Sequence, residues 1–104
     1  MEYKSLGRSG LQVSVVGLGC NNFGMKIDKD ATAVVVNKAI DAGITLFDTA
    51  NIYGGAGKSE EFLGAALGGR RPDVIVATKF SGPMGQGPLN RGASRRHIYH
   101  QVEA

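Results

Sequence analysis

Apolar and polar positions along the chain follow two alternating patterns. Short, nearly uninterrupted apolar runs are typical of strands that are buried on both faces of a parallel sheet. Apolar residues that recur every three or four positions are typical of helices with one buried face. The patterns predict strands at 15–19, 44–47 and 74–78, and they predict helices at 29–42, at 60–67 and from 95 onward.

Capping residues and glycines define the expected ends of the helices. Asp28 is the expected N-cap of the first helix, and Gly43 follows its last turn, where glycine commonly ends a helix. Ser59 is the expected N-cap of the second helix. Glu60 and Glu61 would then lie in its first turn, where carboxylates favour the helix dipole. A pair of glycines ends that helix.

The two ends of the chain give weaker patterns. Residues 2–13 contain two short strand-like segments around the glycine-rich turn GRSG, which predicts a β-hairpin. Ser94 is placed to open the last helix, which carries Ile98, Tyr99 and Val102 on one face.

The spacing of the strands indicates the architecture. Their ends at Gly19, Asp48 and Lys79 recur after about 30 residues, the length of one strand–helix unit. Such units form a parallel sheet with right-handed crossovers. A doubly wound nucleotide-binding fold would place G-x-G-x-x-G after the first strand, but the last glycine is replaced by Asn22. The pattern therefore favours an α/β fold of the (β/α)8 TIM barrel type.

A TIM barrel needs roughly 250 residues. We therefore expect residues 1–104 to be the N-terminal portion of a single barrel domain. Residues 2–13 would supply its hairpin, and residues 15–104 would supply about three of its eight β/α units.

Composition adds few constraints. The chain is 42% hydrophobic, with a net charge of +3 and a pI near 9.2, and its acidic residues are interspersed, so we expect no nucleic-acid partner. A single cysteine, Cys20, excludes an internal disulfide and suits a reducing compartment. No apolar run approaches the roughly 20 residues of a membrane span, and the first residues do not resemble a leader. The expected location is the cytoplasm, without membrane contact.

One group of residues indicates chemistry. Asp48 ends the second strand, Tyr53 follows it closely, and Lys79 ends the third strand. The carboxyl ends of barrel strands meet at one rim, which is where the active sites of TIM barrels lie. A neighbouring ammonium favours the ionised form of a phenol, so Tyr53 could act as a general acid near neutral pH. A structural ion-pair network is the alternative interpretation of the same residues.

With these residues the chain resembles the N-terminal part of an aldo-keto reductase over nearly its whole length. Residues 7–14 (GRSGLQVS) and 17–19 (GLG) are similar to the opening of one branch of the family. That branch holds many bacterial reductases and the beta subunits of voltage-gated potassium channels. Residues 47–54 (FDTANIYG), with Ser59-Glu60 and Leu63-Gly64, resemble the first family signature. Residues 76–80 (VATKF) resemble its lysine strand.

The resemblance implies an NADPH-dependent oxidoreductase that reduces aldehydes or ketones to alcohols by hydride transfer. Tyr53 would be the general acid, Lys79 would make the Tyr53 phenol more acidic, and Asp48 would hold Lys79 in its charged form. NADPH would be contacted by Asp48 and by the loop after the first strand: Gly19, Cys20, Asn21 and Asn22. The substrate would be a small carbonyl compound.

The family's fourth catalytic residue is a histidine at the end of the next strand, and this sequence has no match for it. We therefore expect the 104 residues alone to be inactive. A cofactor-binding regulatory or assembly subunit, similar to the potassium-channel beta subunits, is the alternative to an enzyme. If the chain functions at this length, we expect it to self-associate through the open edges of its sheet.

Other polar groups are given structural interpretations. His97 and His100 could share a metal, but we expect both to lie on a solvated helix face, and we assign no metal site. A basic group lies at the start of the last helix: Arg91, Arg95, Arg96 and His97. We interpret it as a helix start whose basic side chains have no partners in these residues, rather than as a phosphate or nucleic-acid site. Cys20 is read as a small apolar core residue rather than as a redox-sensitive thiol.

Overall fold

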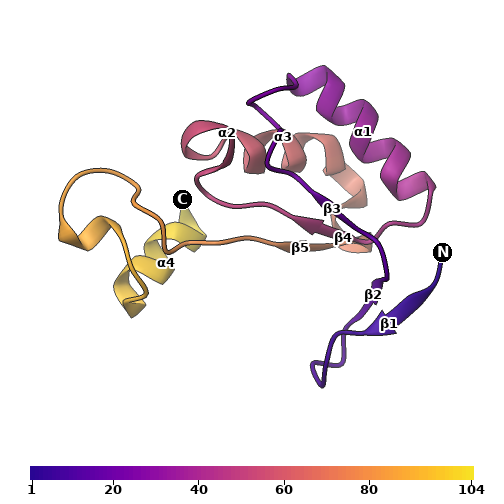
Figure 1. Cartoon of the computed structure of the whole chain (residues 1–104), viewed down its shortest axis with the longest axis horizontal. Coiled ribbons are helices and arrows are strands. Elements are labelled where there is room, and N and C mark those ends of the chain that lie inside the picture. The colour runs from indigo at the N-terminus through magenta and orange to yellow at the C-terminus, as the bar shows by residue number, and fades with distance from the viewer.

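A computed structural model describes all residues 1–104 (Figure 1). The N-terminal half contains a hairpin and two strands separated by one helix: β1 (Tyr3–Ser5), β2 (Gln12–Ser14), β3 (Gly17–Gly19), α1 (Lys29–Asp41) and β4 (Leu46–Asp48). The rest contains one more strand among helices and 3₁₀ turns: α2 (Tyr53–Ala56), α3 (Lys58–Leu67), η1 (Gly68–Asp73), β5 (Ile75–Ala77), η2 (Pro88–Asn90) and α4 (Arg95–Glu103). No helix combines the length and the apolar character needed to cross a membrane.

The three strands after the hairpin form a parallel sheet in the order β3-β4-β5. Gly19 pairs with Asp48, and Asp48 pairs with Ala77, so the carboxyl ends of the three strands lie at one rim. The predicted strands and their parallel arrangement are confirmed, although each strand is shorter than its apolar run.

The predicted hairpin is also confirmed, and it lies at the opposite rim of the sheet. β1 and β2 pair antiparallel, with Tyr3 opposite Ser14. The hairpin is attached where β4 begins, because the Ser14 and Thr45 hydroxyls each accept a hydrogen bond from the other residue's backbone N–H. The amino-terminal rim is therefore occupied by the hairpin, and the carboxyl-terminal rim is left for functional groups (Figure 1).

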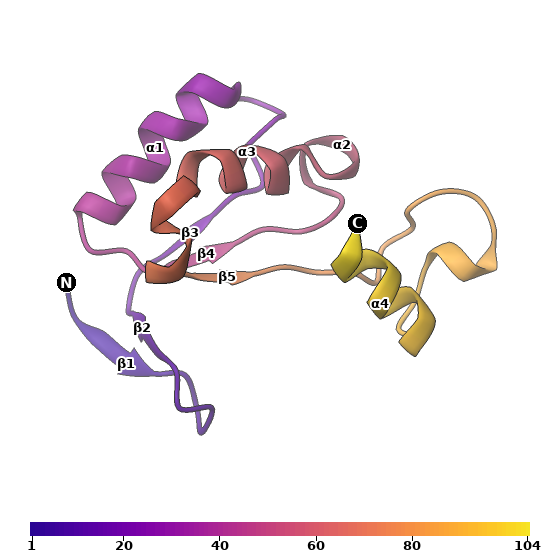
Figure 2. The ribbon, with the colours of Figure 1, turned by 180° about the vertical axis from the view of Figure 1, so that it is seen from behind.

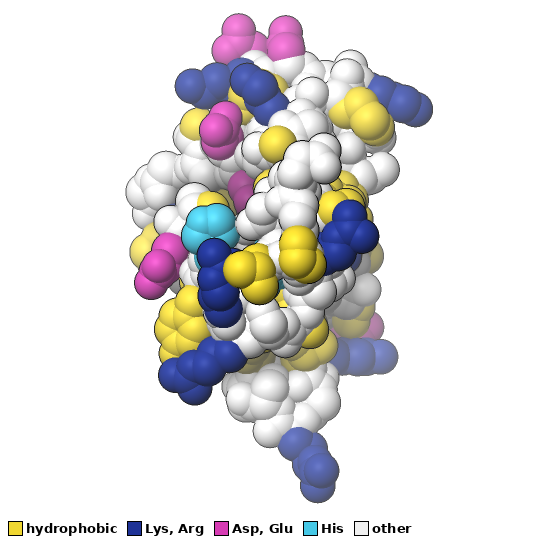
Figure 3. All heavy atoms as spheres, turned by 90° about the vertical axis from the view of Figure 1, so that its left-hand side faces the viewer, with side chains coloured by type: hydrophobic (Ala, Val, Ile, Leu, Met, Phe, Trp, Pro, Cys, Tyr) yellow, Lys and Arg dark blue, Asp and Glu magenta, His cyan; other side chains and the backbone are white.

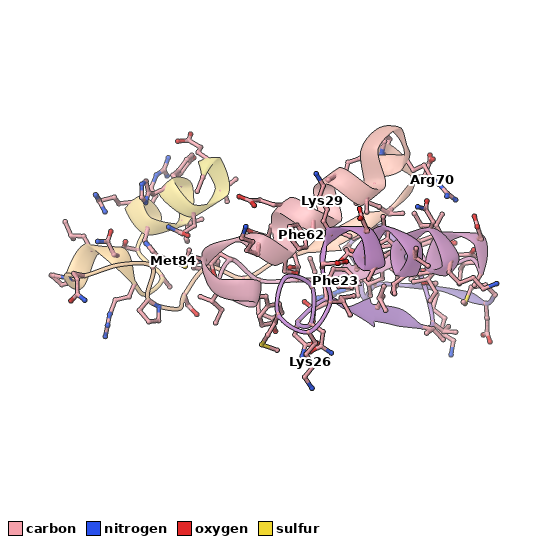
Figure 4. All side chains as sticks on the ribbon, turned by 90° about the horizontal axis from the view of Figure 1, so that it is seen from above. Phe23, Lys26, Lys29, Phe62, Arg70 and Met84 are labelled. Carbon is pink, nitrogen blue, oxygen red and sulfur yellow. The ribbon has the colours of Figure 1, made fainter.

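Helices α1 and α3 cover one face of the sheet, and no helix covers the other face (Figures 1 and 2). Seen from above, the two helices lie side by side, and Phe23 lies in the loop beside them (Figure 4). The core between sheet and helices consists of buried apolar side chains from β4, α1, α3 and the adjoining loops: Cys20, Phe23, Val36, Ala39, Phe47, Leu63, Leu67 and Val74.

The first helix follows its sequence pattern closely. Asp28 is its N-cap, and its carboxylate accepts a hydrogen bond from the Ala31 N–H at 2.9 Å. Val36 and Ala39 are buried against the sheet. Gly43 follows the last turn with φ 90°, a conformation that glycine adopts without strain.

The prediction that Ser59 caps the second of the predicted helices is wrong. α3 begins one residue earlier, at Lys58, and the residue before it is Gly57, with φ 105° and no side chain to cap the helix. Ser59 lies inside the first turn and is fully buried. A short additional helix, α2, precedes α3 and was not predicted from the sequence.

The last helix confirms one expectation and contradicts another. Ser94 is its N-cap, and the serine hydroxyl accepts a hydrogen bond from the His97 N–H at 3.1 Å. The expectation that both histidines are solvated is wrong for His97, which is fully buried, whereas Tyr99 and Val102 are largely exposed. Seen from the α4 end, Lys and Arg side chains are scattered over the surface rather than gathered into one patch (Figure 3).

The buried position of Ser59 gives a stability prediction. A true N-cap accepts aspartate readily, but a carboxylate inside the core would lack solvation. We expect Ser59→Asp to lower the free energy of unfolding by about 3 to 5 kcal/mol, as uncompensated buried charges do. Urea unfolding of the purified protein measures this change.

Lys58→Asp is the matched control, because it places the same carboxylate on the exposed first residue of α3. It should change the unfolding free energy by no more than about 1 kcal/mol, because it also removes the contact of the Lys58 ammonium with the Phe62 ring. Equal stability of the Ser59→Asp and wild-type proteins would restore the capping interpretation.

Candidate active site

Asp48, Tyr53 and Lys79 come together at the carboxyl-terminal rim of the sheet. The Lys79 Nζ lies 2.7 Å from Asp48 Oδ1 and 3.3 Å from Tyr53 Oη. The side chains of Lys79 and Asp48 are 48% and 55% exposed, so the group is open to solvent rather than enclosed. The acid, the phenol and the amine are thus adjacent, and a ligand can reach them.

Lys79 is the centre of this group. Its ammonium has three N–H donors, and it donates to Asp48 Oδ1, to the Thr49 carbonyl at 2.9 Å and to Tyr53 Oη. The hydrogen bond to Asp48 is the largest of the effects that raise the pKa of Lys79 above its ordinary value; partial burial acts in the opposite direction. Lys79 is therefore an ammonium throughout the physiological pH range.

Tyr53 reaches Lys79 because the chain folds back immediately after it. Gly54 adopts φ 71°, and a Cβ there would lie 2.5 Å from the Phe23 carbonyl oxygen. Only glycine fits this turn without movement of the backbone. The turn places the Tyr53 ring beneath the Lys79 ammonium, which lies 4.8 Å from the ring centroid. This arrangement adds a cation–π contact to the hydrogen bond.

Two buried hydroxyls connect the loops behind the site. The Ser59 hydroxyl donates to the Cys20 carbonyl at 2.7 Å and lies 2.8 Å from the Thr49 hydroxyl. The loop after β3, the loop after β4 and the first turn of α3 are thereby joined. Sequence reasoning missed both roles, since Ser59 was interpreted as a cap and Thr49 only as part of a motif.

The residues predicted to contact a cofactor lie in the loop after β3, beside Asp48. Gly19 and Asn21 are exposed, and Asn22 is half-buried. A Cβ built on Gly19 would meet only the Asn21 side chain, at 3.8 Å, so the rim is open at this point. Asp48 Oδ2 has no partner within the chain and remains available as an acceptor.

Cys20 differs from its neighbours in this loop. Its side chain is fully buried in the core, its N–H donates to the Asp48 carbonyl at 2.9 Å, and its own carbonyl accepts from Ser59. A direct contact between Cys20 and a cofactor would therefore need a rearranged loop. The burial agrees with the interpretation of Cys20 as a core residue, and burial is the main cause that raises the pKa of its thiol to about 11.

The hollows in the surface lie elsewhere. One of about 330 Å³ lies between α3 and α4, and Glu60, Glu61, Met84 and Gln101 are among its lining residues. It contains none of Asp48, Tyr53 and Lys79. Figure 4 shows Met84 in the loop beside the start of α3. We assign the chemistry to the open rim, because the titratable groups that contact one another are there.

Residues 15–104 match the protein-family model described as "Aldo/keto reductase family". Among curated proteins, the chain is 46% identical to a protein of Oryza sativa subsp. japonica named "Probable voltage-gated potassium channel subunit beta". It is 44% identical to an uncharacterized oxidoreductase of Bacillus subtilis. Each alignment covers 94% of this chain, but only 30% of the rice protein and 34% of the bacterial one.

Among solved structures, the chain is similar to an aldo-keto reductase from Bacillus halodurans in its holo form. The TM-score is 0.86 with 35% sequence identity, and the match covers 99% of this chain and 34% of that one. The chain thus spans about a third of the length of the proteins that it matches.

Burial of Cys20 predicts slow thiol chemistry. The thiolate is the reactive form, and with a pKa of about 11 roughly one thiol in a thousand is ionised at pH 8. We expect iodoacetamide to label Cys20 at least about 100-fold more slowly in the native protein than in urea. Mass spectrometry of timed samples measures both rates. Similar rates in the two conditions would show that the thiol is accessible and reactive.

Proposed function

The chain belongs to the aldo/keto reductase family, and we propose that the protein it forms part of reduces aldehydes or ketones to alcohols with NADPH. In this family's (β/α)8 TIM barrel, residues 1–104 provide the N-terminal hairpin and the first three β/α units. The observation that carries the proposal is the contact of Lys79 with both Asp48 and Tyr53 at the carboxyl-terminal rim.

Tyr53 is proposed as the proton donor. Reduction adds a hydride to the carbonyl carbon, and the negative charge that develops on the carbonyl oxygen is neutralised by the Tyr53 Oη proton. The phenolate that remains is stabilised by the Lys79 ammonium, 3.3 Å away, and is reprotonated from solvent. Asp48 balances the charge of Lys79 and keeps the ammonium at this position.

The exposed residues of the rim fit the nicotinamide end of a dinucleotide. NADPH, when bound, would supply the hydride. Gly19 offers space for a flat ring or ribose, and Asp48 Oδ2 and the exposed Asn21 offer polar contacts to ribose hydroxyls. Asn22 shapes this loop, because its carbonyl accepts hydrogen bonds from the N–H groups of Met25, Lys26 and Ile27.

A regulatory subunit is the alternative, since one similar protein carries the name of a potassium-channel subunit. The complete contact set of Asp48, Tyr53 and Lys79 favours the enzyme, because binding a cofactor alone does not require a phenol next to an ammonium. Tight NADPH binding by the wild-type protein, without turnover on a panel of aldehydes and ketones, would support the alternative.

Removal of the Tyr53 hydroxyl tests the proposed chemistry. In the complete enzyme, we expect Tyr53→Phe to lower kcat by about 10²- to 10⁴-fold, the usual contribution of a general acid, while the Kd for NADPH stays within about threefold. Steady-state kinetics and titration of NADPH fluorescence measure the two quantities. Tyr99→Phe is the matched control, because Tyr99 is exposed on α4 and lies outside the rim. Near-normal turnover in Tyr53→Phe would rule out its role as the acid.

For the 104 residues prepared alone, we propose self-association through the sheet edges. β3 and β5 each leave one edge unpaired, and Val15 and Val16, which lead into β3, are about half exposed. Light scattering after size-exclusion chromatography should give a mass above 10.9 kDa. Val16→Lys should reduce the association, and Val34→Lys on the exposed side of α1 should not. A monomer in all three samples would contradict the proposal.

A further inference from the structure

We propose that α4 positions the Lys79 side chain by holding the backbone of residues 79 and 80 in place. His97 is the principal positioning residue. The inference rests on the proposed function, because it concerns how the Lys79 ammonium is kept next to Tyr53. The His97 side chain makes no hydrogen bond with Asp48, Tyr53 or Lys79. Its effect would pass through the main chain.

Lys79 needs such support because it lies beyond the end of the sheet. β5 ends at Ala77, and beyond it only two backbone hydrogen bonds continue the β4–β5 pairing: from the Thr49 N–H to the Ala77 carbonyl at 2.8 Å and, at a longer 3.3 Å, from the Asn51 N–H to the Lys79 carbonyl. Residues 78–80 are irregular. An irregular segment at a rim can shift more easily than a strand. The position of a side chain mounted there depends on contacts from other elements.

His97 supplies the first of these contacts. Its ring Nε2 lies 2.8 Å from the carbonyl oxygen of Phe80, the residue after Lys79. A carbonyl only accepts, so Nε2 donates this hydrogen bond. Nδ1 is buried and has no partner in the chain. A buried polar atom without a partner costs stability. The hydrogen bond to the Phe80 carbonyl is therefore the only one that the buried His97 ring makes within the chain.

Gln101, one turn further along α4, supplies the second contact. Its Oε1 accepts a hydrogen bond from the Asn51 side chain at 2.8 Å, and the Asn51 backbone N–H donates to the Lys79 carbonyl at 3.3 Å. Asn51 is buried and lies two residues before Tyr53. The helix thus reaches the carbonyls of Lys79 and Phe80 by two separate routes.

The position of α4 is itself well defined. Ser94 caps the helix through the His97 N–H, and the long loop before it is closed by a hydrogen bond from the Gly92 N–H to the Ser81 carbonyl at 3.0 Å. Figures 1 and 2 show α4 beyond the end of β5, on the same side of the molecule as the rim. The helix, its loop and the residues after β5 therefore form one connected unit.

The contact between Lys79 and Tyr53 is the most sensitive to this unit. It is the longest of the three ammonium hydrogen bonds, at 3.3 Å against 2.7 Å and 2.9 Å. A small displacement of the Lys79 backbone would lengthen it beyond hydrogen-bond distance first. The phenol would then lose the neighbouring charge that favours its ionised form, while the Lys79–Asp48 ion pair persists.

The test uses the complete NADPH-loaded enzyme and compares kcat as a function of pH for wild type, His97→Leu and His97→Gln. We expect His97→Leu to lower kcat by about 10- to 100-fold, as small misplacements of catalytic groups do. The alkaline limb of its kcat profile should also move to higher pH, because the Lys79 ammonium no longer lies beside the phenol. His97→Gln places an amide N–H near the position of Nε2. It should therefore keep the wild-type kcat and the wild-type pH position of the alkaline limb.

Glu103→Leu is the matched control, since it replaces an exposed polar side chain of α4 that takes no part in the hydrogen bonds of this unit, and it should behave like wild type. A merely structural role would lower the amount of active enzyme without moving the limb. If His97→Leu folds and the alkaline limb of its kcat–pH profile stays where it is in wild type, the proposal is overturned, whatever the value of kcat. If circular dichroism shows that His97→Leu does not fold, Gln101→Leu takes its place. We expect the alkaline limb of its kcat profile to move to higher pH as well, and an unmoved limb would overturn the proposal.

Failure of the proposed function would look different. A wild-type enzyme without turnover on aldehydes or ketones would defeat the reductase assignment rather than the positioning role. Crystal structures of wild type and the folded variant then decide the inference. A Lys79 Nζ that has left Tyr53 Oη in the variant supports it, and an unchanged 3.3 Å contact overturns it.

Discussion

The hydrogen bonding of one ammonium group organises the functional end of this chain. Lys79 donates to a carboxylate, a backbone carbonyl and a phenol, and these three acceptors come from β4, the residue after β4 and the start of α2. All three donors of the ammonium are used. A neutral amine would lose both the ion pair with Asp48 and the charge beside Tyr53. The close contact with Asp48 makes that neutral form unfavourable at physiological pH.

The surrounding structure brings these groups to one place by several independent means. Parallel register places the ends of β4 and β5 at the same rim, and the left-handed Gly54 turns the chain so that Tyr53 faces back toward Lys79. Hydrogen bonds of the buried Thr49 and Ser59 hydroxyls join the loops after β3 and β4 to the first turn of α3. The amino-terminal rim carries the hairpin instead. This division between a closed rim and an open rim is the arrangement expected of a barrel enzyme.

Much of this organisation follows from local sequence signals. Asp28, Gly43 and Ser94 define helix ends as expected, because capping depends on atoms within a few residues of one another. The grouping of Asp48, Tyr53 and Lys79 followed from strand spacing, since the ends of parallel strands meet. Their mutual contacts are seen in the structure, whereas their roles in a reaction stay a proposal.

The features that the sequence did not reveal depend on distant contacts. Whether Ser59 caps α3 or enters the core is decided by the Cys20 carbonyl, 39 positions away in the chain. His97 and His100 have similar local surroundings in sequence. Only the folding of the long loop brings the Phe80 carbonyl to one of them. A helical pattern gives the period of the buried positions, but it does not say which element covers them.

The shielded thiol in the loop after β3 has a consequence under the proposed reduction of carbonyl compounds at the rim. Aldehydes add to accessible thiolates to form hemithioacetals, and such an adduct next to the rim would compete with reduction. Cys20 is bonded through its backbone to Asp48, yet its sulfur points into the core and stays protonated at neutral pH. Under the proposed function, a carbonyl substrate at the rim would therefore not be captured by Cys20, the only cysteine of the chain.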